Sequence, residues 1–476
     1  MLLIAGLGAF MGPIDVTVVA VALPALGDAL GLSFSGALWV QAGYLLSYAL
    51  ALIPVGRLAD QWGRLRVWRL GVLVFALGSL GAGLATGPEV LIVSRLVQGV
   101  GGGMLAATAA ALVSAAYPPQ RRGQALGLTI MAIYLGLSVG PLVGGLLIEV
   151  ADWRAIFLVN LPVAAVALLV AAPLHEPRPR AGRPSLDPPG TITLGGALVG
   201  LLVGVSFGPL WGWSSSRVTA LLAGGAVAAA LFVVTQSRGR APLLDLGLFR
   251  RSRLYALGNL AALLNYTAAF GCIALTAVLC EVVAGYRPIE TGLVLVGQAG
   301  VMAVVAPLAG RLSDTIGSRA LASGGMVVIA AGLIVLALLP AGVPLAHLLA
   351  GLVLVGAGMG LFSSPNTAAV MGAAPRDDYG VASAVLALMR TLGQSFSLAV
   401  LGSIAAASLG PAGADVLVGA GAPGTGAEEY LDGYRAAMAV AATIALIGAA
   451  LSLGRGRRAE VPHVALPPPG PTGGPG

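Results

Sequence analysis

The stretch "GRLADQWGRLRVWRLG", residues Gly56–Gly71, holds four arginines and one acid, Asp60. It stands out because only 9% of the 476 residues are charged, whereas 58% are hydrophobic. Long apolar runs with so little charge are typical of integral membrane proteins, in which a helix of roughly 20 residues crosses the hydrocarbon core. We therefore interpret the stretch as a polar connection between two membrane helices.

The apolar runs on either side of this stretch predict an all-α integral membrane protein with fourteen transmembrane helices. The first run carries Asp15 and lacks a charged leader, which favours a membrane helix over a cleaved signal peptide. An even number of crossings places both termini on the same side of the membrane. The expected helices span residues 2–24, 38–58, 69–87, 89–113, 124–148, 153–173, 190–210, 217–236, 255–283, 290–310, 319–340, 344–371, 381–409 and 434–454.

The arginines indicate which side of the membrane is which. Of the 26 basic residues, twenty fall in the loops after the even-numbered helices or in the C-terminal tail. The opposite loops hold four, namely Arg154, Arg217, Arg287 and Arg435. By the positive-inside rule we expect both termini in the cytoplasm. The membrane in which we expect the protein is the inner membrane of a bacterium. The net charge of +7 follows from this topology, and no basic face with interleaved aromatic residues indicates nucleic-acid binding.

A shorter version of the opening stretch, "GRLSDTIGSR", returns at residues 310–319. The two copies occupy matching places, each after the second helix of a six-helix half, if the seventh and eighth helices are an insertion. Two matched halves around a midplane cavity are typical of secondary transporters. The expected parts are an N-terminal half (1–174), a linker with two additional helices and a cytoplasmic loop (175–250), a C-terminal half (251–454) and a disordered cytoplasmic tail (455–476).

Other chemistries find no support in the sequence. No phosphate-binding "GxxxxGK[ST]" loop is present, and "GVGGG" lies inside an expected span instead of following a strand. The three histidines lie in separate segments and form no metal cluster, and no nucleophile–base signature appears. Cys272 and Cys280 are two helical turns apart, which suits inert apolar residues better than a disulfide or a metal pair. We therefore expect no enzymatic activity, no metal and no cofactor.

Two charged residues inside expected spans are the main candidates for function. Asp15 lies mid-helix, and an acid that holds or releases a proton as water access alternates is what proton coupling requires. The same carboxylate would suit a cationic substrate, and the structural alternative is a hydrogen-bonded residue that packs the first helix. Arg95 shares a face of the fourth helix with Gln98, Gly99 and Gly102. The alternative to a functional role for Arg95 is a structural one, in which it pairs with backbone carbonyl groups.

Polar and aromatic side chains at helical spacing are candidates for the lining of a central substrate cavity. For each aromatic residue, ordinary packing is an equally good explanation. The candidates are Gln41, Tyr44, Tyr48, Gln98, Asn160, Asn259, Tyr266, Gln298, Asn366, Arg390 and Gln394. Glu281 lies near the outer end of the ninth helix, where we expect a solvated interfacial acid, with a second proton or cation site as the alternative.

Six segments resemble the motifs of the major facilitator superfamily, in particular its fourteen-helix drug:proton antiporters, the EmrB/QacA-like multidrug exporters. The resemblance covers nearly the whole chain, and the motifs follow in the expected order. The segments are "IDVTVVAVALP" (14–24), "GRLADQWGRLR" (56–66), "RLVQGVGGG" (95–103), "GLSVGPLVGG" (136–145), "WRAIFLVNLP" (153–162) and "SSPNTAAVM" (363–371). The resemblance implies a fold of two six-helix halves with two added helices.

The resemblance also implies roles for single residues. Asp15 is expected to couple transport to protons, and Arg95 to keep a positive charge near this titrating site. The fifth helix is expected to bend and to seal the central interface through a glycine- and proline-containing segment, with plain packing as the alternative. The residues of this segment are Gly136, Gly140, Pro141, Gly144 and Gly145.

A third implied role is a latch at the cytoplasmic face. Asp60 is expected to contact the N-terminus of a helix that begins near Gly380 and so to hold the outward-facing state, with charge-only topology as the alternative. In the second copy, Ser318 replaces the usual basic residue, which weakens the ionic contacts expected there. The residues assigned to the latch are Gly56, Asp60, Gly63, Arg64, Arg66, Gly310 and Asp314.

Together, the sequence and the resemblance predict a proton-coupled antiporter. It is expected to export drug-like or lipophilic compounds across the cytoplasmic membrane by alternating access, with the proton gradient as its energy source. The alternatives are a dedicated exporter of a natural product, such as an antibiotic to which its producer must be resistant, and a non-transporting membrane sensor or scaffold with the same fold. The expected partners are the lipid bilayer, protons and a small lipophilic or cationic substrate, without nucleic acid, and a monomer is expected.

Overall fold

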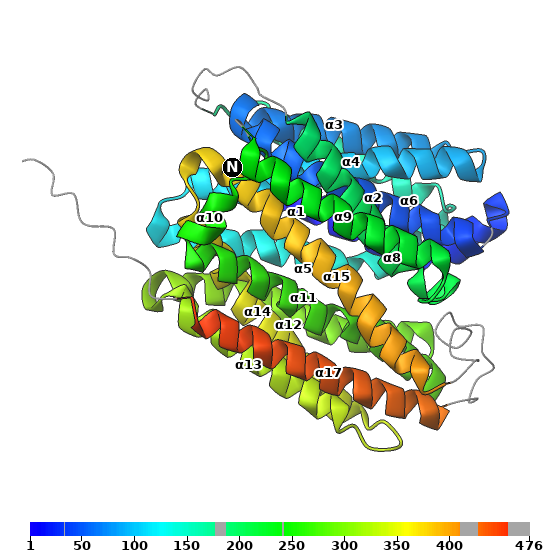
Figure 1. Ribbon diagram of the computed structural model, residues 1–476. Coiled ribbons are helices and arrows are strands. Elements are labelled where there is room, and N and C mark those ends of the chain that lie inside the picture. Colours follow the sequence, from blue (N-terminus) through cyan, green and yellow to red (C-terminus); the bar gives the residue numbers. More distant parts are fainter. Residues whose placement is uncertain (33, 177–186, 240–241, 410–426, 456–476) are drawn as a thin grey trace, which may run out of the picture.

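The computed structural model describes residues 1–32, 34–176, 187–239, 242–409 and 427–455, and every regular element in these ranges is a helix (Figure 1). Thirteen of these helices are long and apolar enough to cross a membrane. The expected all-α membrane fold is therefore confirmed. The expected linker from residue 175 lies partly, and the expected disordered tail (455–476) almost wholly, outside the described residues.

The helices fall into three groups along the chain. The first half contains α1 (Leu2–Leu30), α2 (Phe34–Trp62), α3 (Arg64–Gly83), α4 (Pro88–Ala116), α5 (Pro119–Val150), α6 (Ala155–Leu158) and α7 (Asn160–Ala171). The inserted group contains α8 (Pro188–Trp211), α9 (Ser216–Arg238) and α10 (Leu246–Arg251). The second half contains α11 (Arg253–Val278), a π-helix (Leu279–Val283), α12 (Pro288–Ile316), α13 (Ser318–Ala337), α14 (Leu345–Ala373), a 3₁₀-helix (Arg376–Asp378), α15 (Tyr379–Ala407) and α17 (Ala427–Leu453).

The sixth expected crossing differs from the other expected crossings. In place of one helix over 153–173, the chain forms the shorter apolar segment Ala155–Ala171, which is split into α6 and α7 at Val159. Pro162 has no N–H to donate to the carbonyl group of Leu158, so the helix is interrupted there. The segment is also shorter than the roughly 20 residues that span the hydrocarbon core. By length alone, the described chain thus has thirteen crossings and one short apolar segment instead of fourteen equal helices.

The opening stretch is a sharp corner instead of the expected loop. α2 continues to Trp62, a single residue, Gly63, separates it from α3, and Gly63 has a φ of 104°. The second copy repeats this geometry at Gly317, between α12 and α13, with a φ of 88°. Both angles lie in the region that favours glycine. The charged side chains at the end of α2 reach water or ion-pair partners without unwinding the helix. The helix therefore continues past residue 58, where the onset of charge predicted its end.

Helix α8 covers one seam between the two halves (Figure 1). α8 packs along α9 and contacts both α2 and α15, which belong to different halves. The ring centroid of Phe207 on α8 lies 5.1 Å from that of Trp39 on α2. Each half has its own apolar core, around residues such as Trp68 in the first and Met326 in the second. We call the end of the bundle that holds the two glycine corners the arginine-rich end.

Candidate functional site

Asp15 and Arg95 form an ion pair inside the first half. Nη1 of Arg95 lies 2.5 Å from Oδ2 of Asp15, and both side chains are completely buried. The other carboxylate oxygen, Oδ1, accepts hydrogen bonds from Nε2 of Gln98 (2.7 Å) and Nδ2 of Asn160 (3.2 Å). Both oxygens of Asp15 therefore face donors, which is the arrangement that suits an ionised carboxylate.

Arg95 has further contacts that do not depend on Asp15. Its Nε donates to the carbonyl oxygen of Val40 at 3.2 Å. Its guanidinium carbon lies 4.3 Å from the ring centroid of Tyr44 and 5.9 Å from that of Phe157. Aromatic faces attract a cation through their quadrupole. The positive charge of Arg95 is thus stabilised by groups other than the carboxylate of Asp15 as well.

Ser79 on α3 completes this buried cluster. Its hydroxyl oxygen accepts hydrogen bonds from Gln98 (2.8 Å) and Asn160 (3.3 Å). α3 comes this close to α4 because Gly78 has no side chain, since a Cβ there would lie 2.5 Å from the backbone nitrogen of Gln98. The sequence analysis missed Ser79, a lone serine on an apolar helix, because no motif marks it.

The glycine ladder of α5 packs on α1, next to Asp15. A Cβ on Gly136 would lie 2.8 Å from the carbonyl oxygen of Phe10, and one on Gly144 would lie 3.2 Å from Val18. At Gly140, the same atom would overlap the hydroxyl of Thr17. These contacts are within the first half and not at the interface between halves, where the ladder was expected to act. Close packing within one half explains the glycines, because small residues let helix backbones approach.

Gly140→Ala is expected to destabilise the protein, by about 1–3 kcal/mol, because overpacking of a tight contact forces the helices apart. Gly145→Ala is the matched control on the same helix, since nothing lies within 4 Å of a Cβ at Gly145. Thermal unfolding of the two purified variants measures the difference. Equal unfolding temperatures would show that the α1–α5 contact is looser than described.

Asp60 contacts the second half at the arginine-rich end. Its two carboxylate oxygens accept hydrogen bonds from the backbone N–H groups of Gly380 (2.7 Å) and Val381 (3.0 Å), in the first turn of α15. A carboxylate in this place satisfies free amide groups and faces the positive end of the helix dipole. Arg64 pairs with the same carboxylate at 3.0 Å. The helices can cross so closely because a Cβ on Gly56 would lie 2.6 Å from the carbonyl oxygen of Gly380.

The second copy of the motif makes the corresponding contact in the opposite direction. Asp314 on α12 accepts hydrogen bonds from the backbone N–H groups of Gly123 (2.9 Å) and Gln124 (3.0 Å) on α5. Gly310 crosses Gly123 as Gly56 crosses Gly380. Among the described residues, Asp314 has no ion pair, in keeping with Ser318 at the position where a basic residue is common. The contacts of Asp60 and Asp314 are thus alike in backbone geometry and unlike in charge.

Further contacts between the halves gather at the same end. Arg57 pairs with Asp378 at 3.2 Å, and Arg64 donates to the carbonyl oxygen of Arg376 at 2.6 Å. Gly63 serves only as the corner, and Arg66 is exposed and outside these contacts. Among the residues that the structure describes, the hydrogen bonds between the halves lie at the arginine-rich end or near the middle of the helices. The conformation is therefore closed at the arginine-rich end.

Gly380→Ala is expected to loosen this closed end. A Cβ at this position would lie 2.3 Å from the carbonyl oxygen of Gly56 and 2.9 Å from the carboxylate of Asp60. If these clashes force α2 and α15 apart at a cost of about 1–3 kcal/mol, the amide groups in the first turn of α15 would exchange roughly 5- to 150-fold faster. Hydrogen exchange followed by mass spectrometry measures this rate. Gly402→Ala on the same helix is the control, with open space around the new Cβ, and equal exchange in both variants would contradict the expectation.

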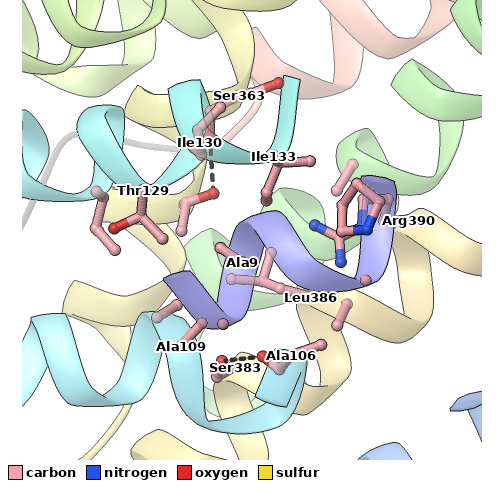
Figure 2. A pocket seen from close by; sticks show the side chains of 18 of the residues that line it. Ala9, Ala106, Ala109, Thr129, Ile130, Ile133, Ser363, Ser383, Leu386 and Arg390 are labelled. Carbon is pink, nitrogen blue, oxygen red and sulfur yellow. Dashed lines mark hydrogen bonds between the residues drawn. The ribbon is translucent and has the colours of Figure 1, made fainter. Parts of the chain in front are cut away.

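A cavity lies between the halves, from the middle of the helices toward the arginine-rich end (Figure 2). It holds about 820 Å³ of empty space, its open mouth included, and is lined by α1, α2, α4 and α5 from one half and α11, α14 and α15 from the other. In the view of Figure 2, Arg390 and Thr129 lie on opposite sides with Ala9 of α1 between them. Nη2 of Arg390 donates to the hydroxyl of Tyr48 at 2.9 Å.

The expected cavity residues separate into three groups. Those that line the cavity are Tyr48, Tyr266, Asn366 and Arg390. Those that surround the Asp15–Arg95 pair instead are Tyr44, Gln98 and Asn160. Those in neither place are Gln41, Asn259, Gln298 and Gln394. Gln41 donates to the carbonyl oxygen of Val16, and Asn259 donates to that of Tyr255. Helical spacing identified polar faces but not which neighbour each face meets.

Several hydroxyl residues near the cavity escaped the sequence analysis, among them Tyr134, Ser363 and Ser383. Tyr134 on α5 bonds to the hydroxyls of Ser363 (2.9 Å) and Tyr266 (3.4 Å) across the two halves. Ser383 on α15 donates to the carbonyl oxygen of Ala106 on α4 at 3.2 Å.

Glu281 is exposed in the π-helix that follows α11. Within the described ranges, no three His, Cys, Asp or Glu residues are grouped as a metal ion would require.

Comparison with known proteins agrees with this architecture. "Multidrug resistance protein Stp" of Mycobacterium tuberculosis is 36% identical over 409 residues, which are 86% of this chain and 76% of that protein. The "Tetracenomycin C resistance and export protein" of Streptomyces glaucescens is 31% identical over 90% of this chain and 80% of that protein. The solved structure of the human organic anion transporter MFSD10 (TETRAN) has a TM-score of 0.67 at 18% identity, covering 95% of this chain and 98% of that one. This low identity shows the fold alone.

The family follows from the extent of these matches. The sequence pattern of the Major Facilitator Superfamily matches residues 5–398 and 260–471. Relatives above 30% identity cover most of the chain and are named as resistance and export proteins. This chain therefore belongs to the Major Facilitator Superfamily, and it is a membrane transporter rather than an enzyme.

Proposed function

We propose that the chain is a proton-coupled antiporter that exports small lipophilic compounds by alternating access. The observation that carries this proposal is the completely buried pair of Asp15 and Arg95. An acid deep in a membrane protein is expensive, so a functional role is the first explanation for it. The pair lies outside the lining of the central cavity, so proton binding and substrate binding use different places.

α1 supplies the connection between these two places. Gly12 and Pro13 line the cavity, and Asp15 follows them within one turn of the same helix but faces the interior of the first half. Protonation of Asp15 removes its charge and weakens its bond to Arg95, which keeps its contacts with Val40 and Tyr44. A shift of α1 against the glycine ladder of α5 would then alter the cavity wall. This is the step that we propose couples proton uptake to substrate release.

The arrangement of charge supports an orientation for this cycle. We propose that the arginine-rich end faces the cytoplasm and that the protein lies in the cytoplasmic membrane of a bacterium with both termini inside. The contacts of Asp60 and Asp314 then close the cytoplasmic side. The described conformation would be the outward-facing one. Opening of both glycine crossings would give the inward-facing one.

The range of substrates separates two versions of this proposal. Relatives named for multidrug resistance support a broad exporter. Other relatives support a dedicated exporter of one natural product. They are named "Tetracenomycin C resistance and export protein", "Probable actinorhodin transporter" and "Puromycin resistance protein pur8". A sensor or scaffold is the weaker candidate, because it has no use for a buried ion pair beside a cavity. A resistance panel in a susceptible host would separate broad from narrow export.

Transport into inside-out membrane vesicles tests the proposal. Respiration acidifies the lumen, so an antiporter would accumulate its substrate there and lose it when an uncoupler is added. A fluorescent lipophilic cation and a fluorescent lipophilic anion should be tested side by side. Uptake of either probe that exceeds the uptake by vesicles without the protein, and that the uncoupler reverses, would support the proposal. Uptake that continues unchanged after the uncoupler is added would exclude proton coupling. If no compound of the resistance panel were taken up, the scaffold function would be favoured.

A further inference from the structure

The cavity between the halves carries one kind of charge. Among the described residues that line it, Arg390 is the only charged one, and none is acidic. Arg390 lies twelve residues into α15, near the middle of the membrane-spanning helix, and is partly exposed to the cavity. Its one hydrogen bond to the described chain goes from Nη2 to Tyr48. The other N–H groups of the guanidinium are free to meet a molecule in the cavity.

Among the described residues, no acidic side chain lines the cavity beside this cation. None of the ion pairs of the described chain includes Arg390, and the hydrogen-bond partner of its guanidinium is the hydroxyl of Tyr48. Asp15, the buried acid of the first half, is already paired with Arg95 and fully enclosed. An arginine in the membrane interior is costly and normally has a partner of opposite charge. We infer that the missing partner is an anionic group of the substrate.

The rest of the lining describes the other parts of that molecule. Hydroxyl and amide groups of Tyr48, Tyr266, Ser363 and Asn366 line the same cavity, and that of Tyr48 bonds to Arg390. Most of the remaining wall is formed by alanine, isoleucine and leucine side chains and by glycine backbone. An arginine with neighbouring hydroxyl donors suits a carboxylate or an ionised phenol, and the apolar wall suits an aromatic ring system.

We propose that the cavity selects lipophilic aromatic acids over lipophilic cations. The proposal rests on the proposed function, because only a transporter holds its substrate in this cavity. It narrows the substrate expected from the sequence, since the cationic alternative required contact with Asp15. Expulsion of an anion is also favoured by a membrane potential that is negative inside. Arg390 is then the residue that determines charge specificity.

Binding of three matched probes to the purified protein in detergent tests the proposal. Anthracene carboxylate, anthracene methanol and anthracene methylamine share one ring system and differ in charge. Equilibrium dialysis against protein-free micelles gives the affinity of each. We expect the carboxylate to bind about tenfold or more tightly than the amine, and Arg390→Gln to weaken carboxylate binding by about 10- to 100-fold with little change for the alcohol.

Two further variants make the result specific. Arg390→Lys keeps the charge and is expected to restore most of the preference for the carboxylate. Arg311→Gln removes an exposed arginine from α12 and is expected to bind all three probes like the wild type. The proposal is overturned if the carboxylate fails to bind the wild type, if the amine binds more tightly, or if Arg390→Gln, eluting as a folded monodisperse protein, binds the carboxylate unchanged. Binding needs no gradient, so a failure of proton coupling leaves this result intact, and the reverse also holds.

Discussion

Asp15→Asn is expected to reduce gradient-driven transport to the level of membranes without the protein, while exchange of substrate across the membrane at zero gradient continues. Asparagine cannot alternate between a charged and a neutral form, so the proton-dependent change at the Asp15–Arg95 pair is lost. The cavity does not include Asp15, so substrate binding remains. Reconstituted vesicles allow both rates to be measured on the same preparation.

Glu281→Gln is the control for this prediction. Glu281 is also an acid of an apolar span, but it is exposed in the π-helix that follows α11 and does not line the cavity. Its replacement is expected to leave gradient-driven transport in place. If Asp15→Asn transported like the wild type and Glu281→Gln did not, the coupling acid would be Glu281, and the role proposed for the buried pair would be wrong.

Arg95→Gln is expected to cause the largest loss of stability. It leaves the carboxylate of Asp15 completely buried without its positive partner. Removal of one member of a buried ion pair typically costs about 3–5 kcal/mol, because the remaining charge is left uncompensated. Thermal unfolding of the purified protein measures the effect. The same change at Arg154, whose pair with Asp152 has side chains 40% and 51% exposed, is expected to cost about 0–1 kcal/mol.

A double variant identifies the origin of this loss. Asp15→Asn/Arg95→Gln removes both charges, so its unfolding temperature is expected to lie above that of Arg95→Gln alone. Contacting residues in one network are not additive, which is what this comparison detects. If the double variant lost the sum of the two single effects, the two side chains would act independently, and the ion pair would not be the source of the instability.

The fold was predictable because its cause is local. Apolar runs long enough to span a membrane identified most helices, and arginine placement separated the two ends. The departures have local reasons too. Pro162 interrupts the sixth expected crossing, and Gly63 makes a corner that needs no loop. Charge at the end of α2 was taken as the end of the helix, although the side chains of Asp60 and Arg64 are satisfied by each other and by α15.

The site was predictable only in part, because it depends on contacts between distant segments. The position of Asp15 in a span marked it as a candidate, but its pairing with Arg95, 80 residues away, depends on how α1 meets α4. The contact of Asp60 with Gly380 was expected only from the family resemblance. Tyr134 and Ser363, which join the halves across the cavity, carry no pattern that separates them from ordinary polar residues in apolar helices.

We propose that substrate and proton move in opposite directions through this protein. The most direct test uses proteoliposomes loaded with a pH-sensitive dye and with a substrate found in the vesicle assay, with no pH gradient imposed. Dilution into substrate-free buffer creates an outward substrate gradient. The account predicts that the lumen acidifies with the wild type, and does not with Asp15→Asn or with protein-free liposomes. Substrate efflux from the wild type without acidification, or equal acidification with Asp15→Asn, would contradict it.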